Sequence, residues 1–146
     1  MEGGTAIAEI IYGDVNPSGK LVDTFAGSFD DYPSSAGFNE SEDYVEYTED
    51  IYVGYRYFDT FDVPVRYPFG YGLSYTDFSV EVLNTRTDGT KAELTVLVKN
   101  IGKTAGKEVV QVYVCPPQGK LGKPVRNLNS FYKTQLLTPG EGEEVN

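Results

Sequence analysis

The amino-acid sequence predicts a mainly β protein whose second half folds as an antiparallel β-sandwich. Three runs, at residues 78–84, 92–100 and 107–114, alternate apolar with polar side chains. Alternation with a period of two is typical of strands that bury one face. The breaks between the runs, TRTDGT and IGKTAG, hold the glycines and polar residues of hairpin or sandwich loops. Short strands at this spacing favour a sandwich.

A short helix and a short strand are expected ahead of the sandwich. The apolar residues of TAIAEIIY, residues 5–12, come in neighbouring pairs one helical turn apart, and Gly13 is placed to end the helix. A helix of about two turns is marginal alone in water, so it needs something to pack on. KLVDTF, residues 20–25, then reads as a short strand.

The stretch between this strand and the sandwich is expected to link them. Residues 26–42 show no clear period and predict a surface loop. Loops of that length are usually functional, linking or poorly ordered. DIYVGYRYFD, residues 50–59, carries apolar or aromatic side chains on both alternating faces, so it predicts a strand that is covered on both sides.

The tail predicts an apparently truncated sandwich. NLNSFYKTQLL, residues 127–137, reads as a strand, and Pro139 and Gly140 form a turn after which another strand should begin. The chain ends at Asn146, with about three to five strands where an immunoglobulin-like sandwich needs about seven. We expect exposed apolar faces and unpaired strand edges, and hence partial order or self-association of the isolated chain.

Composition and charge argue against several classes of function. The formal net charge is −10, from 12 basic and 22 acidic residues, and it opposes binding to nucleic acid or anionic lipid. No run approaches the roughly 18 apolar residues of a membrane span, and the start of the chain lacks the basic region of a signal peptide. We expect a soluble protein without nucleic-acid or membrane partners, belonging to a cytoplasmic or secreted parent.

The residues that commonly carry catalysis or bind metals are scarce. Histidine is absent, which removes the Ser-His-Asp triad and the commonest metal ligand. The single cysteine, Cys115, excludes an internal disulfide and a cysteine zinc site. Its place at the end of the apolar run VVQVYVC predicts a buried or half-buried core residue. No cofactor and no metal are expected.

Charge is distributed unevenly along the chain. Residues 21–55 hold nine carboxylates and no Lys or Arg, whereas residues 99–133 hold seven bases and one acid. Two oppositely charged surface regions are the favoured interpretation. A calcium site is the alternative, although the regular ligand spacing of a calcium-binding loop is missing. Its candidate ligands are Asp30, Asp31, Glu40, Glu42 and Asp43.

Five segments occur in the order found in one enzyme family. They are GDVNPSGKL (13–21), YTEDIYVGYRYFD (47–59), YPFGYGLSYTDF (67–78), VKNIGKTAGKEVVQVYV (98–114) and LLTPGE (136–141). Together they cover nearly the whole chain. On these segments the sequence resembles family 3 glycoside hydrolases, the β-glucosidase and β-xylosidase family of carbohydrate metabolism.

The resemblance implies three parts. Residues 1–25 are similar to the last helix and strand of the family's α/β sandwich domain, residues 26–66 to its linking segment, and residues 67–146 to its fibronectin type III-like domain without the last strands. This implies a non-catalytic accessory or structural part of a retaining β-glycosidase. Its partners would be the remaining α/β sandwich and barrel domains, and carbohydrate substrate would bind only to the intact enzyme. An independent carbohydrate-binding or adhesion module, with the tyrosines of residues 44–75 stacking on sugar rings, is the alternative.

The resemblance carries over no catalytic residue. Retaining glycosidases need two carboxyl groups about 5 to 5.5 Å apart. The family nucleophile is an Asp in a Ser-Asp-Trp type motif of the barrel, and this chain has no Trp; the acid/base Glu lies upstream of GDVNPSGKL. The family usually has a Glu followed by a Gly at residues 49 and 50. In this chain Glu49 matches the Glu, and Asp50 replaces the glycine. An ion pair of Glu49 with Arg56, or a cap on the linking strand, is favoured over a catalytic role or substrate contact at an active-site edge.

The segment VRYPFGYGLSYTDF, residues 65–78, first suggests an aromatic grip on a ligand. Its context, between an apolar linking strand and the first sandwich strand, favours a joint between two structural units. We therefore expect an interdomain seam, with its rings buried where domains meet. The residues of this seam are Tyr67, Phe69, Gly70, Tyr71, Gly72 and Tyr75.

Overall fold

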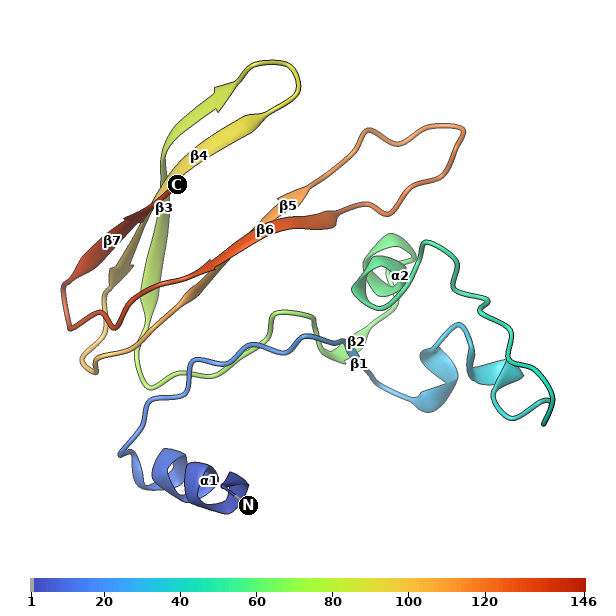
Figure 1. The fold of residues 1–146 in the computed structure, drawn as a ribbon, viewed down its shortest axis with the longest axis horizontal. Helices are drawn as coiled ribbons and strands as arrows, with labels where there is room; N and C mark the ends of the chain where they lie inside the picture. Colours follow the sequence, from blue (N-terminus) through green and yellow to red (C-terminus); the bar gives the residue numbers. More distant parts are fainter. Residues whose placement is uncertain (1) are drawn as a thin grey trace. The chain divides into compact units, whose positions relative to one another are not determined.

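The computed structural model describes residues 2–146, which form two compact units. The first unit contains the residues up to Gly19, together with Gly72–Val110 and Phe131–Asn146. The second unit contains Lys20–Tyr71 and Gln111–Ser130. Strands outnumber helices in the chain, and every strand pair with a defined register is antiparallel (Figure 1). The predicted mainly β class is confirmed.

The predicted N-terminal helix is present as α1, Gly3–Tyr12. Gly13 ends it in the left-handed conformation, with φ 83°, and donates its backbone N–H to the carbonyl of Ile10 at 3.0 Å. Among the described residues of the helix none is buried, and Ile7 and Ile11 are 61% and 72% exposed. Its apolar stripe therefore has no cover within the first unit.

The first unit contains a three-stranded antiparallel sheet in the order β3-β4-β7, with β3 Phe78–Thr87, β4 Ala92–Asn100 and β7 Gly142–Val145. Val80 pairs with Val98 and Val82 with Val96, after which a bulge before Asn84 shifts the register. The turn at Pro139 and Gly140 is present as predicted, and the short strand β7 follows it, although the sequence suggested that the chain stops before a strand forms there. Figure 1 shows the three strands as one sheet.

The core of the first unit is small and lies on one face of this sheet. Its buried apolar residues are Val96, Val98, Leu137 and Val145, and Phe78, Leu94 and Val110 pack against them. The alternation at 94, 96 and 98 thus predicted the buried face of β4. Val80 and Val82 are 54% and 58% exposed, because β3 lies at the edge of the sheet and leaves them partly uncovered.

A buried asparagine holds the loops at one end of this sheet. Asn100 is fully buried, and its Oδ1 accepts hydrogen bonds from Thr76 Oγ1 at 2.7 Å and from the backbone N–H of Gly102 at 3.0 Å. Its Nδ2 donates to the carbonyls of Thr104 and Leu137, at 2.8 and 2.9 Å. All four hydrogen bonds connect loops to the end of β4, so one side chain fixes several turns.

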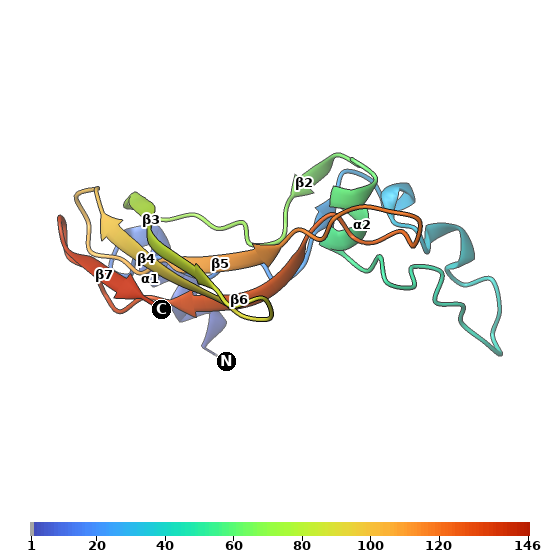
Figure 2. The ribbon, with the colours of Figure 1, turned by 90° about the horizontal axis from the view of Figure 1, so that it is seen from above.

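Strands β5, Val109–Val114, and β6, Asn127–Lys133, form a separate two-stranded pair. Figure 2 shows them as a long hairpin with its connecting loop at the far end. β6 is shorter than the predicted strand at 127–137, because the chain leaves the ladder after Lys133 and makes only an isolated bridge between Leu137 and Gly106.

The second unit contains short elements and one correction to the sequence prediction. Its elements are β1 Phe25–Ala26, η1 Phe29–Asp31, η2 Ser35–Gly37, α2 Tyr55–Thr60 and β2 Val65–Tyr67. The prediction of a strand at residues 50–59 is wrong, because the second half of this segment belongs to the helix α2. Gly54 precedes this helix with φ 57° and ψ −132°, a conformation that breaks an extended strand and that glycine adopts readily. Two 3₁₀ turns lie in the predicted loop at 26–42.

Candidate functional site

The aromatic segment 65–78 contains a point where the chain passes from one compact unit to the other. Tyr67, Phe69, Gly70 and Tyr71 belong to the second unit, whereas Gly72 and Tyr75 belong to the first. The six predicted seam residues therefore divide into two groups, each with its own set of contacts.

A tight turn in the second unit depends on Gly70. The backbone N–H of Tyr71 donates to the carbonyl of Pro68 at 3.1 Å, and Gly70 has φ 82°, which L side chains rarely adopt. A Cβ atom at this position would also lie 2.5 Å from Gln111 Oε1. Leu21 holds the turn through two backbone hydrogen bonds of 2.8 Å, one to Gly70 and one to Tyr71. Glycine is therefore favoured by the backbone conformation, and a larger residue would also have to displace the end of the Gln111 side chain.

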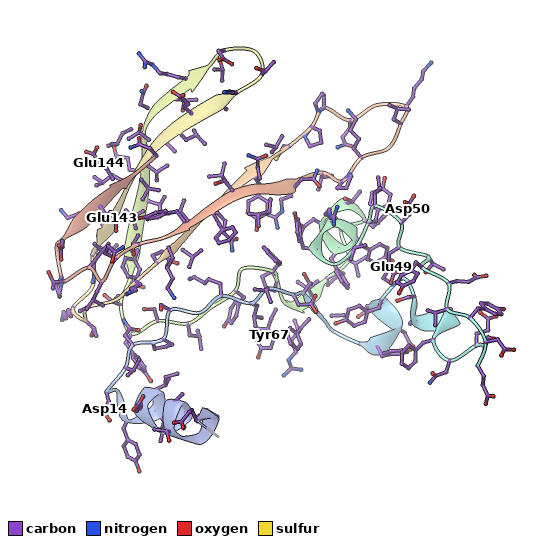
Figure 3. The ribbon with its side chains drawn as sticks, in the orientation of Figure 1. Asp14, Glu49, Asp50, Tyr67, Glu143 and Glu144 are labelled. Atoms are coloured by element: carbon purple, nitrogen blue, oxygen red, sulfur yellow. The ribbon has the colours of Figure 1, made fainter. Side chains whose placement is uncertain are left out.

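The rings of Tyr67 and Tyr71 contact each other on the surface of the second unit. Their centroids are 5.1 Å apart, and Phe25 packs edge-on against Tyr67 at 6.3 Å. Tyr67 extends from the end of β2 (Figure 3), and the Arg66 guanidinium lies 6.0 Å from its ring centroid. Tyr67 and Tyr71 remain 38% and 37% exposed, so this chain alone does not bury them.

Phe69 packs into an aromatic cluster formed by α2 and the β5–β6 hairpin. Its ring lies 4.8 Å from that of Tyr55, which in turn lies 5.9 Å from Tyr113 and nearly perpendicular to it. The Tyr55 hydroxyl accepts a hydrogen bond of 2.7 Å from the backbone N–H of Leu128. The half-buried Phe69 side chain thus contributes to the packing of the second unit.

An ion pair closes the same cluster. Arg126 Nε donates to Asp59 Oδ2 at 2.7 Å, and the guanidinium lies 5.0 Å from the ring centroid of Tyr113. The hydrogen bond that Arg126 donates to Asp59 raises the pKa of Arg126, and burial raises the pKa of the Tyr113 phenol. Both groups are therefore held in the protonated forms that donate hydrogen bonds.

In the first unit, Tyr75 fastens the C-terminal turn of α1. Its hydroxyl donates to the carbonyl of Ile10 at 2.7 Å, and its backbone N–H donates to Asn16 Oδ1 at 2.9 Å. Asn16 Nδ2 in turn donates to the carbonyl of Ala105 at 3.0 Å. Tyr75 is 51% exposed, so its hydroxyl makes an anchor while much of its ring remains on the surface.

Glu49 and Asp50 lie on the loop ahead of α2 (Figure 3). The carbonyl of Glu49 accepts a hydrogen bond of 2.8 Å from Tyr52, and Asp50 has φ 50°. The position therefore adopts the left-handed conformation suited to glycine, and Asp is among the residues that tolerate it best. Within residues 20–71, no ion pair joins Glu49 to Arg56; the second unit instead pairs Asp59 with Arg126.

The acidic loop and the cysteine show no arrangement typical of a reactive site. Asp31 Oδ2 accepts the backbone N–H of Ser28 at 2.7 Å and so caps η1. Across residues 2–146, no group of three or more Cys, Asp or Glu side chains is close enough to hold a metal ion.

Cys115 is exposed, so the prediction of a buried or half-buried residue is wrong. No described helix is long and apolar enough to cross a membrane.

Two family models match the chain. The glycosyl hydrolase family 3 C-terminal domain matches residues 1–75, and the fibronectin type III-like domain matches residues 108–146. The chain belongs to glycoside hydrolase family 3. The family and the fibronectin type III-like sandwich inferred by resemblance are confirmed.

Several β-glucosidases are similar to almost the whole chain. β-Glucosidase A of Butyrivibrio fibrisolvens is 53% identical over 99% of the chain. The solved structure of β-glucosidase 3B from Thermotoga neapolitana, in complex with glucose, is 50% identical over 99% of the chain, with a TM-score of 0.91. The solved structure of a β-glucosidase from Paenibacillus barengoltzii is 51% identical over 98% of the chain, with a TM-score of 0.90. The chain spans only 20%, 21% and 16% of these three proteins.

Sequence reasoning missed the contacts that organise the segment's surroundings. Asp59 and Arg126 are 67 residues apart, and Asn100 and Leu137 are 37 apart. A polar residue at the end of an alternating strand was the one available signal for Asn100. Nothing in the local pattern around Arg126 distinguishes it from the other bases of its region.

Proposed function

We propose that the chain is a non-catalytic accessory part of a retaining β-glycosidase of the β-glucosidase type. The observation that carries the proposal is the combination of 53% identity over 99% of the chain with a span of only 20% of that relative. The motifs that hold the family's two catalytic carboxyl groups have no counterpart in these 146 residues. The remaining domains, an α/β sandwich and a barrel, would supply them and bind the carbohydrate.

The proposal includes a division of the chain and a role for segment 65–78. Residues 1–25 would complete an α/β sandwich domain, residues 26–66 would link, and residues 67–146 would form the fibronectin type III-like domain. The seam residues would then brace one domain against another. The surface rings of Tyr67 and Tyr71, and the exposed apolar stripe of α1, support this because they offer apolar area that this chain leaves uncovered.

The first experiment measures hydrolysis of an aryl β-glucoside by the purified 146-residue chain. We expect no turnover above the level of the buffer, because a chain that lacks both catalytic carboxyl groups cannot form and hydrolyse a glycosyl-enzyme. The matched variant Glu49→Gln controls for a contribution from the most suggestive carboxylate. Turnover that co-purifies with the chain and disappears in this variant would overturn the proposal.

An independent carbohydrate-binding module is the second candidate, favoured by one observation. Tyr44 and Tyr47 are 57% and 89% exposed on the loop ahead of α2, where a sugar ring could stack. Most of the other tyrosines nearby pack against aromatic rings of the same unit, which leaves them less available. Titration with gluco- and xylo-oligosaccharides separates the candidates. If the chain has the accessory role, we expect it to bind these oligosaccharides no more tightly than millimolar. If it is a binding module, we expect tighter binding that Tyr47→Ala removes.

A further inference from the structure

The outer edge of β3 is a strand edge without a partner in the sheet. The order β3-β4-β7 places β3, Phe78–Thr87, at one end of the sheet, and its residues pair on one side only, with β4, except for Leu83 at the bulge. Such a long row of free backbone N–H and C=O groups is a template for another strand. Val80 and Val82, 54% and 58% exposed, add apolar surface beside this edge.

Two opposite charges, those of Glu81 and Arg86, stand on this edge strand. Glu81 lies opposite Leu97 and Arg86 opposite Glu93 in the β3–β4 ladder. Residues directly opposite each other in an antiparallel pair point to the same face. Leu97 and Glu93 lie on the face of β4 away from Val96 and Val98, so Glu81 and Arg86 share the outer face. Among residues 2–146, neither charge takes part in an ion pair.

The bulge in β3 is what puts these two charges on the same face. Five positions separate them, and in a regular strand an odd separation places two side chains on opposite faces. The register shift between Val82 and Asn84 changes this parity. A strand with charges so placed can pair with its own copy, because a two-fold axis perpendicular to the sheet keeps each face on its own side.

We propose that β3 pairs antiparallel with β3 of a second copy of this chain, with Glu81 of each copy opposite Arg86 of the other. The same register sets Val82 opposite Thr85 and Val80 opposite Thr87, all on the inner face. The contact is isologous, so the Glu–Arg pair forms twice and the assembly closes as a dimer. Two three-stranded sheets become one sheet of six strands across the axis.

The inference is separate from the proposed function, because it concerns only the β3 edge. A second copy of the chain is chosen as the partner because Glu81 and Arg86 on one strand are complementary to Arg86 and Glu81 on another. Each chain has a net charge of −10, which opposes association, but at physiological salt the Debye length is about 8 Å and distant charges are screened. The close Glu–Arg pairs are screened far less.

Sedimentation equilibrium on the 146-residue chain at physiological salt gives the first test. We expect a concentration-dependent equilibrium between monomer and dimer. A chain that remains monomeric up to sub-millimolar concentration overturns the proposal. Larger, open-ended aggregates also overturn it, because an isologous pairing stops at two copies.

Charge reversal tests the register. Glu81→Arg alone and Arg86→Glu alone each turn two attractive pairs into two repulsive ones, and each should weaken dimerisation by about tenfold or more. An equimolar mixture of the two variants restores both pairs and should form heterodimers. The double variant Glu81→Arg/Arg86→Glu should dimerise like the original chain. Failure of the mixture and of the double variant to recover, with all variants folded, would overturn the register.

Glu144→Arg is the matched control, since Glu144 is exposed on β7, at the opposite edge of the same sheet. It should leave the dimer unchanged, and an effect equal to that of Glu81→Arg would overturn the choice of edge.

Cross-linking gives an independent measurement. Val82→Cys with Thr85→Cys, in a Cys115→Ser background, should form a covalent dimer on mild oxidation. The two positions are about 10 Å apart along one strand, too far to bridge within one chain.

Discussion

Arg126 and Asp59 join the β5–β6 hairpin to the helix α2 through a 2.7 Å hydrogen-bonded ion pair. The guanidinium also lies over the ring of Tyr113, and the backbone N–H of Val125 donates to Thr60 Oγ1 at 3.1 Å. Helix and hairpin loop therefore meet through several polar contacts beside the aromatic cluster of Tyr55 and Phe69. We call this group of contacts the clasp.

Removing the charges of the clasp should destabilise the second unit moderately. The two side chains are 41% and 24% exposed, so the ion pair should contribute about 0.5 to 1 kcal/mol. Arg126→Met, which also loses the contact with Tyr113, should cost about 1 to 2 kcal/mol in the free energy of unfolding. A double-mutant cycle with Asp59→Asn in urea denaturation measures the coupling.

Arg66→Met is the control for the clasp. Arg66 also lies near a tyrosine ring, at 6.0 Å, but no carboxylate ion pair within residues 20–71 holds it. It should therefore cost less than Arg126→Met. Equal costs, or no measurable coupling between Asp59 and Arg126, would contradict the importance of the ion pair.

Truncating Phe69 tests whether segment 65–78 is a packed joint or a surface grip. Phe69 is half-buried against Tyr55, so Phe69→Ala should reduce the free energy of unfolding by about 2 to 3 kcal/mol, below the cost at a fully buried site. Phe38→Ala is the control, because that ring is 66% exposed, and it should cost about 1 kcal/mol or less. A loss below about 1 kcal/mol at Phe69 would return the sugar-gripping interpretation.

The strands of the first unit could be predicted because their signal is local. Alternation marked β3 and β4, and the glycine at position 13 marked the end of α1; alternation also marked β5, most of which lies in the second unit. The strand predicted at 50–59 failed because aromatic side chains on both faces of an alternating run also suit a short helix packed on several sides. Gly54 was the available sign of the break, since its φ of 57° ends the extended chain.

The surroundings of the candidate site depend on contacts that are distant in sequence. Phe69 meets Tyr55 and, through it, Tyr113, and no window of ten or twenty residues contains all three. The replacement of the family's glycine by Asp50 suggested that a glycine-type backbone conformation would be lost, but Asp50 keeps a positive φ of 50°. The expected partner of Glu49 was not found, because side-chain pairing depends on tertiary placement that sequence spacing does not fix.

Charging Asn100 should be one of the most damaging single changes in the first unit. Asn100→Asp replaces the amide that donates to Thr104 and Leu137 with an acceptor, and it places a carboxylate in a fully buried site. We expect a loss of about 3 kcal/mol or more in the free energy of unfolding. The same change at Asn129, an exposed residue of β6, should stay within about 0.5 kcal/mol. A small effect at Asn100 would mean that the hydrogen-bond network is dispensable.

The turn before β7 should weaken in acid because of Glu141. The backbone N–H and the hydroxyl of Thr138 both donate to Glu141 Oε2 at 2.9 Å, and these hydrogen bonds lower the pKa of the carboxyl below its ordinary value of 4.5. The lowered pKa belongs to the folded state, so the stabilisation is fully present above the unfolded pKa and is lost as pH falls through the folded one. Unfolding measured from neutral pH downwards should therefore show a loss below about pH 4.5 that Glu141→Gln reduces.

Thr138→Val separates the two donors of this turn. It removes the hydroxyl but keeps the backbone N–H, so the pKa of Glu141, followed by NMR titration, should rise only part of the way towards 4.5. The backbone hydrogen bond is the larger cause of the lowered pKa, so the greater part of the shift should survive. A complete return to the ordinary value would show that the hydroxyl alone holds the carboxylate, and an unchanged pKa would show that the hydroxyl is not a donor in solution.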